Sequence, residues 1–456
     1  MALSLIISPL SLRAFTTMTA TASAPAAFDP VAFDKVVMGT YGRFKLAVAR
    51  GEGCYLWDSD GNKHLDFAAG IATCCLGHAD MSLADAVYNQ MKTVHHVSNL
   101  YYIPQQGQLA TRLVEGSCAD RAFFCNSGAE ANEAAIRIAR QYTGRSKVLT
   151  RYRSYHGGTA NALAATGDFR RNFVHETPGF VKLMDPIPTQ FSWGVDMAEA
   201  SERARGALRE QVLAEGPETI AAIMVEAMPG SAGVLLPPDG YVQAVRSVCD
   251  EFGIVLIMDE VMAGFGRTGE MFGFQHFDDV LPDVVTFAKG LTGSYLPLAG
   301  VAMRSHLQDH FRIHPLGYGA TYQAHPVSLA CGYAVLKHML DEDIVGKVKN
   351  VTAPILKEEM QSLLEDFACI RQARSVGLFA CADLVESATN QRVSGMQGGG
   401  PNAAKIAEFK QALRAEGLIA FFRNCMIHVC PPLTIAPDEL RDGFGKLRRA
   451  LTAVDF

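Results

Sequence analysis

The 456-residue chain has no hydrophobic run of the roughly 20 residues that a membrane-spanning helix needs. It also has no block of lysine and arginine, and its formal net charge is −6. Neither a membrane nor a nucleic acid is therefore expected as a partner. Its eleven cysteines include no Cys-x-x-Cys pair, so we predict no metal site and expect reduced thiols in a reducing compartment.

The first 28 residues lack aspartate, glutamate and lysine, and they contain one arginine, Arg13, among many serines, threonines and alanines. This composition resembles a transit peptide, which predicts a mitochondrial or plastid location. The alternative is a disordered extension with Met18 as the true start, and then a cytoplasmic location is expected.

The rest of the chain has the composition of a globular enzyme, with 49% hydrophobic and 19% charged residues. Apolar strands alternate with amphipathic helices between about residues 80 and 320. This alternation predicts an α/β fold, with a mainly parallel sheet covered by helices and ligands at the carboxyl ends of its strands. The predicted strands are 122–125, 148–150, 220–225, 254–258 and 284–287.

The two ends of the chain predict a smaller α+β domain. Residues 52–67 are typical of a hairpin around Asp60-Gly61. Beyond Pro326, the pattern predicts helices at 327–341 and 402–416, strands at 376–383 and 425–430, and a flexible loop at 394–401. The predicted domains are 29–80 (N-terminal part of the small domain), 81–326 (large ligand-binding domain) and 327–456 (C-terminal part of the small domain).

A lysine and a carboxylate follow two of these strands. Asp259 ends the 254–258 run and precedes a glycine-rich turn, and Lys289 follows the 284–287 run. Burying an ammonium costs several kcal/mol unless it is paired or deprotonated, and a lowered pKa suits a lysine that forms a Schiff base. A carboxylate nearby would keep a ring nitrogen protonated. The pair indicates pyridoxal 5′-phosphate (PLP), although a lone Asp259 is also compatible with a structural acid.

Residues 124–133 predict an anion site. Ser127 can cap a helix, and Glu130 completes the pattern of a capping box. The N–H groups of such a helix start suit a phosphate, although many strand-to-helix turns of this kind bind nothing. Tyr155 follows the strand at 148–150 and can stack on a ring, or be an ordinary core aromatic.

Together these motifs resemble the class III, or ω-amino acid, aminotransferases of PLP fold type I, from about residue 35 to the C-terminus. The resemblance implies that Lys289 forms the Schiff base and moves the proton, and that Asp259 binds the ring nitrogen. It also implies a homodimer, with a tetramer as the alternative, in which Thr321 reaches the phosphate of the neighbouring subunit. The implied cofactor-binding residues are Ser127, Gly128, Ala129, Tyr155, His156, Glu226, Asp259, Val261, Lys289 and Thr321, with Val261 and Tyr155 on the two ring faces.

Three departures from the family pattern concern the amino acceptor. Members that use 2-oxoglutarate carry an arginine where this chain has His428, a glutamate where it has Ser231, and often a glutamine where it has Met262. A histidine and a serine cannot form the arginine–glutamate switch of those enzymes. Arg423 resembles the mobile, substrate-binding arginine of pyruvate-dependent ω-aminotransferases, although it is also compatible with a surface arginine.

Residues 41–114 resemble acetylornithine aminotransferases instead. The prediction is a ping-pong aminotransferase that moves an amino group from an ω-amino acid or amine (taurine, β-alanine or 4-aminobutyrate-like) to pyruvate or glyoxylate. The alternative is a 2-oxoglutarate-dependent enzyme of the acetylornithine/ornithine type. Less favoured are an aminomutase, racemase or decarboxylase of the same fold, and a non-catalytic PLP-binding protein.

Overall fold

The computed structural model describes residues 28–44, 46–175, 177–186, 197–390, 393, 403–423 and 425–456. The proposed transit segment, except Phe28, and the predicted loop at 394–401 lie outside these residues. All eleven cysteines are free thiols. Within the described ranges, no helix combines the length and the apolar character needed to cross a membrane.

A seven-stranded sheet forms the centre of the large body, in the order β4-β10-β9-β8-β7-β5-β6. Its four neighbouring pairs from β9 to β6 are parallel, and β10 is antiparallel to both β4 and β9. The mainly parallel sheet predicted from the sequence is confirmed. Its strands are β4 (Arg121–Cys125), β5 (Lys147–Arg151), β6 (Phe180–Leu183), β7 (Ile220–Glu226), β8 (Val255–Asp259), β9 (Val284–Phe287) and β10 (Ala299–Met303).

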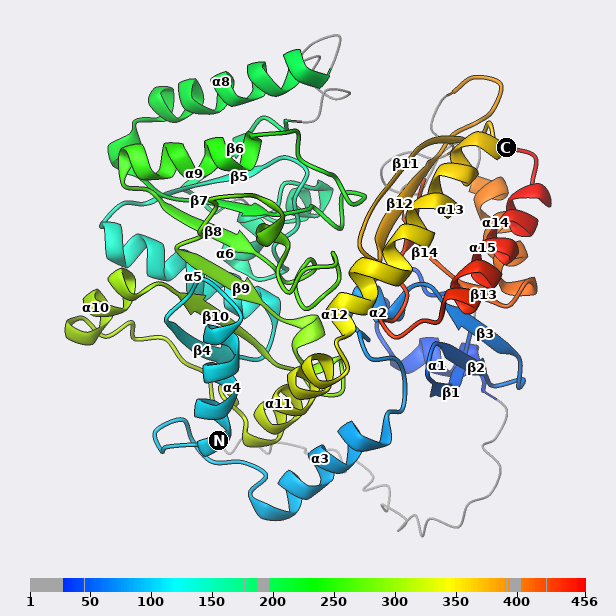
Figure 1. Ribbon diagram of the computed structural model, residues 1–456, viewed down its shortest axis with the longest axis horizontal. Helices are drawn as coiled ribbons and strands as arrows, with labels where there is room; N and C mark the ends of the chain where they lie inside the picture. The colour runs from blue at the N-terminus through cyan, green and yellow to red at the C-terminus, as the bar shows by residue number, and fades with distance from the viewer. Residues whose placement is uncertain are drawn as a thin grey trace, which may run out of the picture.

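Helices cover this sheet, so its middle strands lie in the core (Figure 1). Every residue of β7, β8 and β9 is buried, which explains their continuous apolar sequences. α5 buries a stripe of Ala131, Ala134, Ala135 and Ile138 against the sheet. The helices of the body are α3 (Met81–Thr93), α4 (Pro104–Glu115), α5 (Gly128–Thr143), α6 (Ala160–Ala165), α8 (Met197–Glu215), α9 (Tyr241–Phe252), α10 (Ser305–Ile313) and α11 (Pro326–Asp341).

The second lobe combines segments from both ends of the chain. Its first sheet, β1-β2-β3-β13, pairs β3 in parallel with the C-terminal strand β13. Figure 1 shows these blue strands beside the orange and red C-terminal helices. The second sheet is antiparallel, in the order β11-β12-β15-β14. The strands are β1 (Val48–Glu52), β2 (Tyr55–Asp58), β3 (Lys63–Asp66), β11 (Ile370–Val376), β12 (Phe379–Leu384), β13 (Leu418–Ile419), β14 (Phe421–Arg423) and β15 (Met426–Val429).

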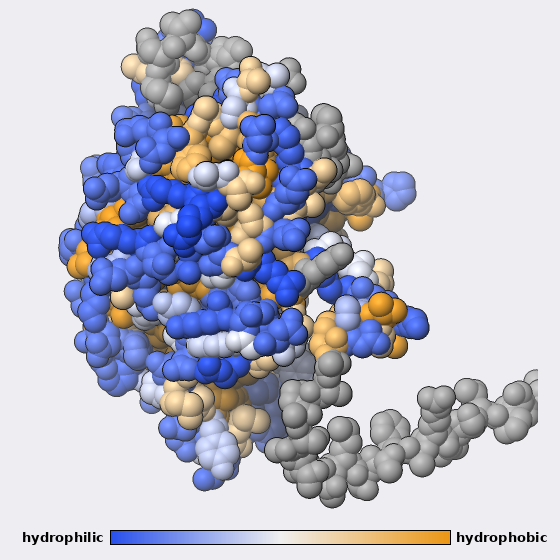
Figure 2. Space-filling view, turned by 90° about the vertical axis from the view of Figure 1, so that its right-hand side faces the viewer, coloured by the Kyte–Doolittle hydropathy of each residue, from blue (hydrophilic) through white to orange (hydrophobic). Residues whose placement is uncertain are grey.

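The remaining helices belong to this lobe or join it to the body: α1 (Pro30–Val36), α2 (Ala69–Ala72), α12 (Ile344–Lys347), α13 (Ala353–Asp366), α14 (Ala403–Ala415) and α15 (Pro437–Thr452). Figure 2 shows the lobe's outer face as mainly hydrophilic, with hydrophobic side chains gathered in smaller patches. A parallel-sheet body with a second α+β lobe from both chain ends is the predicted fold. The exact domain boundaries stay a prediction.

Two local predictions differ in outcome. The turn at Asp60-Gly61 joins the antiparallel strands β2 and β3, as predicted. The strand predicted near 376–383 is found as β12, but β12 begins only at Phe379, because residues 377–378 form the turn of the β11–β12 hairpin. Gly377 makes this turn with φ +59°, and a Cβ there would overlap the carbonyl carbon of Thr268.

Candidate active site

Three neighbouring strands end side by side at one edge of the central sheet. Glu226 at the end of β7 pairs in register with Asp259 at the end of β8, and Asp259 pairs with Thr286 in β9. Lys289 follows β9 and begins a short 3₁₀ turn, Lys289–Thr292. The structure thus places the predicted lysine and carboxylate at the carboxyl ends of adjacent parallel strands, where ligands of such sheets bind.

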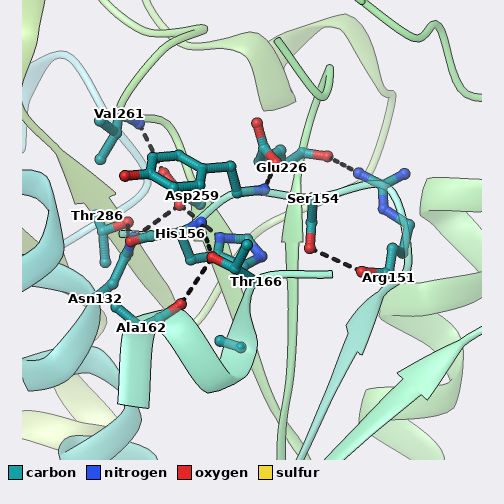
Figure 3. A network of polar contacts seen from close by, with 12 residues as sticks. Asn132, Arg151, Ser154, His156, Ala162, Thr166, Glu226, Asp259, Val261 and Thr286 are labelled. Atoms are coloured by element: carbon teal, nitrogen blue, oxygen red, sulfur yellow. Dashed lines mark hydrogen bonds and ion pairs between the residues drawn. The ribbon is translucent and has the colours of Figure 1, made fainter. Parts of the chain in front are cut away.

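Asp259 is buried and accepts three hydrogen bonds (Figure 3). Its Oδ2 accepts from Asn132 Nδ2 at 2.8 Å and from His156 Nδ1 at 2.7 Å, and its Oδ1 accepts from the Val261 amide at 3.0 Å. A carboxylate offers about four lone-pair directions. One acceptor position on Oδ1 therefore remains for a donor such as a protonated ring nitrogen.

Asn132 is itself held by two further contacts. Its Nδ2 donates to the His156 carbonyl at 2.6 Å, and its Oδ1 accepts from Thr286 Oγ1 at 2.7 Å. The His156 amide donates to Thr166 Oγ1 at 2.9 Å, while its ring Nε2 is buried without a partner in the described part of the chain. His156 thus orients Asp259 (Figure 3), and its predicted contact with the cofactor stays a prediction.

Lys289 has the features of a reactive amine. Burial lowers its pKa below the ordinary 10.5, and the negative charges of Asp259 and Glu226 oppose this shift. Its backbone is left-handed, with φ +45°, a conformation that costs a non-glycine residue about 1–3 kcal/mol. Among the described residues, its amine has no hydrogen-bond or ion-pair partner.

Glu226 is buried and holds backbone groups. Its Oε1 accepts from the Tyr155 amide at 3.0 Å, and its Oε2 accepts from the Gly230 amide at 3.2 Å. Burial raises the pKa of Glu226, His156 opposes the shift, and the charge of Asp259 adds to it. Glu226 therefore positions the half-buried Tyr155.

The start of α5 differs from the predicted capping box. Ser127 is the N-cap, and its side chain accepts from the Glu130 amide at 3.2 Å, as predicted. The Glu130 carboxylate, however, reaches the amide and side chain of Asn126, both at 2.9 Å, one residue before the N-cap. The reciprocal half of the box is therefore wrong. The amides of Gly128 and Ala129 have no partner among the described residues, so both can donate to an anion.

Val261 packs directly against this helix start. A Cβ on Gly128 would lie 2.9 Å from Val261 Cγ1, closer than side-chain atoms pack. The glycine thus lets the free amides of α5 approach the turn after β8. The predicted phosphate cradle and one predicted wall of the ring site are adjacent.

Thr321 does not join these residues within one chain. It lies in the loop between α10 and α11, is exposed, and has no hydrogen bond in the described part of the structure. Its expected contact with the phosphate of a neighbouring subunit stays a prediction.

Arg423 ends β14 and forms an ion pair with Asp168, with Nη2 2.9 Å from Oδ2. Arg170 also pairs with Asp168, and its guanidinium lies 3.6 Å from the centre of the Tyr155 ring. A continuous chain of contacts therefore links Arg423 to the predicted ring wall.

The three positions that depart from the 2-oxoglutarate pattern surround one turn. His428 Nε2 donates to the Gly230 carbonyl at 3.2 Å, Ser231 is the next residue, and a Cβ on Gly230 would overlap Met262 Sδ. Burial lowers the pKa of His428 to about 4, so it is neutral at pH 7. Ser231 and His428 are thus neighbours, and neither carries a charge.

The residues present fit PLP. The buried Asp259 has one acceptor position left, Lys289 offers an unpaired amine of lowered pKa, and two free amides begin α5. Lys289, Asp259, Tyr155, Val261 and the α5 amides would hold the cofactor.

Several residues of this network were not predicted from the sequence: Asn132, Thr166, Thr286, Asp168 and Arg170. Asn132 carries a usable signal, because it is a polar residue in an otherwise alanine-rich buried stripe of α5. The others give no comparable signal in the sequence.

Comparison with known proteins gives consistent results. The family model described as aminotransferase class-III matches residues 37–451. The acetylornithine aminotransferase of Thermosynechococcus vestitus is 37% identical to the chain, and the match covers 93% of this chain and 97% of the relative. The acetylornithine aminotransferase of Synechocystis is 36% identical, and the match covers 95% of each protein. The solved taurine:2-oxoglutarate aminotransferase of Bifidobacterium kashiwanohense, in complex with PLP and glutamate, is 37% identical with a TM-score of 0.87, covering 92% of this chain and 96% of its own. An (S)-enantioselective ω-transaminase of Thermomicrobium roseum is 35% identical with a TM-score of 0.82, covering 89% and 92%.

Proposed function

Because the chain belongs to the class-III aminotransferases and takes PLP as its cofactor, we propose that it moves the terminal amino group of an ω-amine donor to a 2-keto acid. The observation that carries the proposal is the arrangement of one unpaired amine, Lys289, with one carboxylate, Asp259, and one arginine, Arg423, linked to Tyr155 of the same site. These are an acid–base group, an anchor for the cofactor ring and a cation for the substrate carboxylate.

Lys289, Asp259 and Arg423 have different roles in the proposed reaction. When bound, PLP withdraws electrons from the carbon that bears the amine, so that its proton can be removed. The Lys289 amine, with its lowered pKa, takes that proton and returns it. Asp259, held by Asn132 and His156, places a fixed negative charge at the ring nitrogen. Arg423 orients the keto acid through its carboxylate.

The relatives bear on the donor. N-acetylornithine and taurine, which appear in the names of the related proteins, both present a primary amine on a terminal methylene carbon. The relatives favour an acetylornithine-type donor over the β-alanine or 4-aminobutyrate-like donors predicted from the sequence. We therefore propose N-acetylornithine or a similar terminal amine, with taurine as the next candidate.

The relatives also bear on the acceptor. The solved relative that names its acceptor uses 2-oxoglutarate, and this supports 2-oxoglutarate as the proposed acceptor. Pyruvate or glyoxylate is the second candidate. It is favoured by the neutral His428, which lies beside Ser231 where a 2-oxoglutarate enzyme would place an arginine and a glutamate.

A substrate panel tests the proposal. N-acetylornithine, taurine, β-alanine and 4-aminobutyrate are each assayed with 2-oxoglutarate, pyruvate and glyoxylate. We expect the highest kcat/KM for N-acetylornithine with 2-oxoglutarate. A preference for pyruvate of tenfold or more would reject the proposed acceptor and support the second candidate.

A single-turnover experiment separates the aminotransferase from other PLP chemistries. The holoenzyme is mixed with the amine donor and no keto acid, and its visible absorption is followed. One spectral change that then stops is expected, because the amino group stays on the enzyme until a keto acid arrives. Continued product formation would indicate a decarboxylase or racemase instead.

We also propose a homodimer, in which Thr321 completes the neighbouring site. The exposed position of Thr321, next to the exposed Tyr322, supports this proposal.

We further propose that residues 1–28 direct import into a mitochondrion or plastid. The absence of acidic residues from that segment supports this proposal.

A further inference from the structure

Two arginines share one carboxylate at the edge of the candidate site. Asp168 lies at the start of the short 3₁₀ turn Phe169–Phe173, and its Oδ2 is 2.9 Å from Arg423 Nη2. Arg170, two residues along, donates from Nε to both carboxylate oxygens of Asp168 at 3.1 and 3.0 Å. The contact to Arg170 is local, whereas that to Arg423 joins residues 255 positions apart.

This arrangement allows Arg423 to leave at moderate cost. The Arg423 and Asp168 side chains are 17% and 20% exposed, so water can solvate both groups when the pair opens. Burial alone would raise the pKa of Asp168, but the hydrogen bonds and charge of Arg170, and then the charge of Arg423, lower it below 3.8. After Arg423 departs, Asp168 stays ionised and paired with Arg170, so no unpaired charge is left behind.

The same contacts keep Arg423 near the site. The Arg170 guanidinium stacks on Tyr155, whose amide is bound by Glu226, and the positive charge of Arg170 is felt at the Lys289 amine. The Arg423 guanidinium lies 5.7 Å from the Phe169 ring centre, on the same short turn. Its resting place and the candidate site thus share one connected set of residues.

At positions 231 and 428, this chain lacks the glutamate and arginine of the 2-oxoglutarate pattern. Position 231 is a serine, and the nearby His428 is neutral and donates to a backbone carbonyl. We propose that Asp168 is the resting partner of Arg423: the guanidinium stays on Asp168 while no substrate carboxylate lies within its reach, and moves to the carboxylate when a keto acid binds. This inference rests on the proposed role of Arg423, and Asp168 is a positioning residue.

Asp168→Asn in the holoenzyme tests this proposal. The amide keeps the size of the side chain but weakens its hold on Arg423, so more of the guanidinium is free for a carboxylate. We expect the inhibition constant of propionate, a carboxylate without a keto group, to fall about fivefold, and the Michaelis constant for the keto acid 2-oxoglutarate to fall similarly. The Michaelis constant for benzylamine, a donor without a carboxylate, should rise, because Arg423 now stays in the site.

Matched variants separate a switch from a folding effect. Asp168→Glu keeps the charge and should restore values within about twofold of the parent enzyme. Arg423→Gln should weaken the binding of propionate and of 2-oxoglutarate at least tenfold, and adding Asp168→Asn to it should change neither further. Thermal melts of all variants check folding.

Each contrary result has a distinct meaning. If Arg423→Gln changes neither propionate inhibition nor the Michaelis constant for the keto acid, the proposed function of Arg423 fails. If it weakens both, but Asp168→Asn does not tighten propionate, only the resting-partner proposal is overturned. An effect of Asp168→Asn that persists without Arg423 also overturns it, because Asp168 would then act by shaping its own turn.

Discussion

At the scale of single residues, Asp259 depends on the groups that fill its other acceptor positions. Asn132, His156 and the Val261 amide each donate one hydrogen bond to the Asp259 carboxylate. Thr286 in turn donates a hydrogen bond to Asn132 and fixes its side chain. Removing one member of such a buried network leaves the polar groups that it contacted without a partner. The direction in which Asp259 faces a ligand is therefore set by residues that need not contact the ligand.

Asn132→Ala tests this network. The change leaves Thr286 Oγ1 without its acceptor and removes a donor from Asp259, so we expect the free energy of unfolding to fall by about 1–3 kcal/mol. Retention of PLP on dialysis should weaken as well. Urea unfolding gives the first quantity. Asn89→Ala, at an exposed position of α3, is the control and should change stability by less than about 0.5 kcal/mol. Equal losses in the two variants would contradict the prediction.

Positions 428 and 231 can be used to test which keto acid the enzyme accepts. The double variant His428→Arg with Ser231→Glu would place an arginine–glutamate pair at the turn where His428 now contacts Gly230. We expect the kcat/KM ratio of 2-oxoglutarate to pyruvate to rise about tenfold or more, because the added guanidinium can bind the second carboxylate. Each single variant leaves one charge unpaired at this turn, at the buried position 428 or the half-buried position 231, and should fold less stably. An unchanged ratio in the well-folded double variant would show that this turn does not select the acceptor.

At the scale of elements, the start of α5 and the turn after β8 have to approach each other closely. Gly128→Ala should disturb this approach, since its Cβ would meet Val261 at 2.9 Å. We expect a loss of about 1–3 kcal/mol in stability and weaker retention of PLP. Gly107→Ala in α4 is the matched control, because a Cβ there meets no atom within 4 Å and alanine favours a helix. If Gly107→Ala destabilises as much as Gly128→Ala, steric conflict is not the cause.

Glu260, in the turn after β8, should make the folded protein less stable as the pH rises. It is fully buried and accepts from the amides of Gly273 and Phe274, both at 2.7 Å, and burial raises its pKa from 4.5 to about 8. The folded protein therefore binds this proton more tightly than the unfolded chain. The resulting stabilisation is complete below about pH 4.5 and is lost as pH rises through 8.

Glu260→Gln removes this titration. Relative to the variant, the parent protein should lose a few kcal/mol of stability between about pH 5 and pH 8.5. Urea midpoints at several pH values measure the difference between the two proteins. A difference that stays constant over this range would show that Glu260 is ionised in the folded state throughout it.

Some elements were predictable from the sequence, and others were not, for physical reasons. β8 and β9 could be predicted because buried parallel strands need continuous apolar sequences, and Asp259 and Lys289 stand out where those sequences end. β10, with the small residues Ala299 and Gly300, and the two-residue β13 carry little strand signal of their own. The contact between Arg423 and Asp168 could not be predicted, because only the tertiary fold brings residues 255 positions apart together.

At the scale of the whole molecule, one buried arginine joins the body to the second lobe. Arg267, in the glycine-rich turn after β8, donates from Nη1 to the carbonyls of Leu378 at 3.0 Å and Pro431 at 2.6 Å. Its own carbonyl accepts from the Leu378 amide at 3.0 Å. The segment that follows Asp259 thus anchors the lobe that carries His428 and Arg423.

Assembly into a dimer predicts a role for an exposed threonine. Thr321→Ala should weaken PLP retention about three- to tenfold, although Thr321 contacts nothing polar within its own described chain. Light scattering should give twice the mass of one chain for both proteins. Thr452→Ala, at the exposed end of α15, is the control. Unchanged PLP retention in a dimeric Thr321→Ala protein would exclude a contribution of this residue across the interface.

The pairing of β3 with β13 also has a consequence for biosynthesis. The partner of Leu65 in β3 is Leu418, so the first sheet of the second lobe lacks its edge until nearly the whole chain has left the ribosome. At roughly 5–20 residues per second, β3 waits on the order of 20–70 s for that strand. During this interval, its open edge can pair with other nascent chains. Slow synthesis in a heterologous host should therefore increase aggregation, and co-expressed chaperones that bind early segments should reduce it.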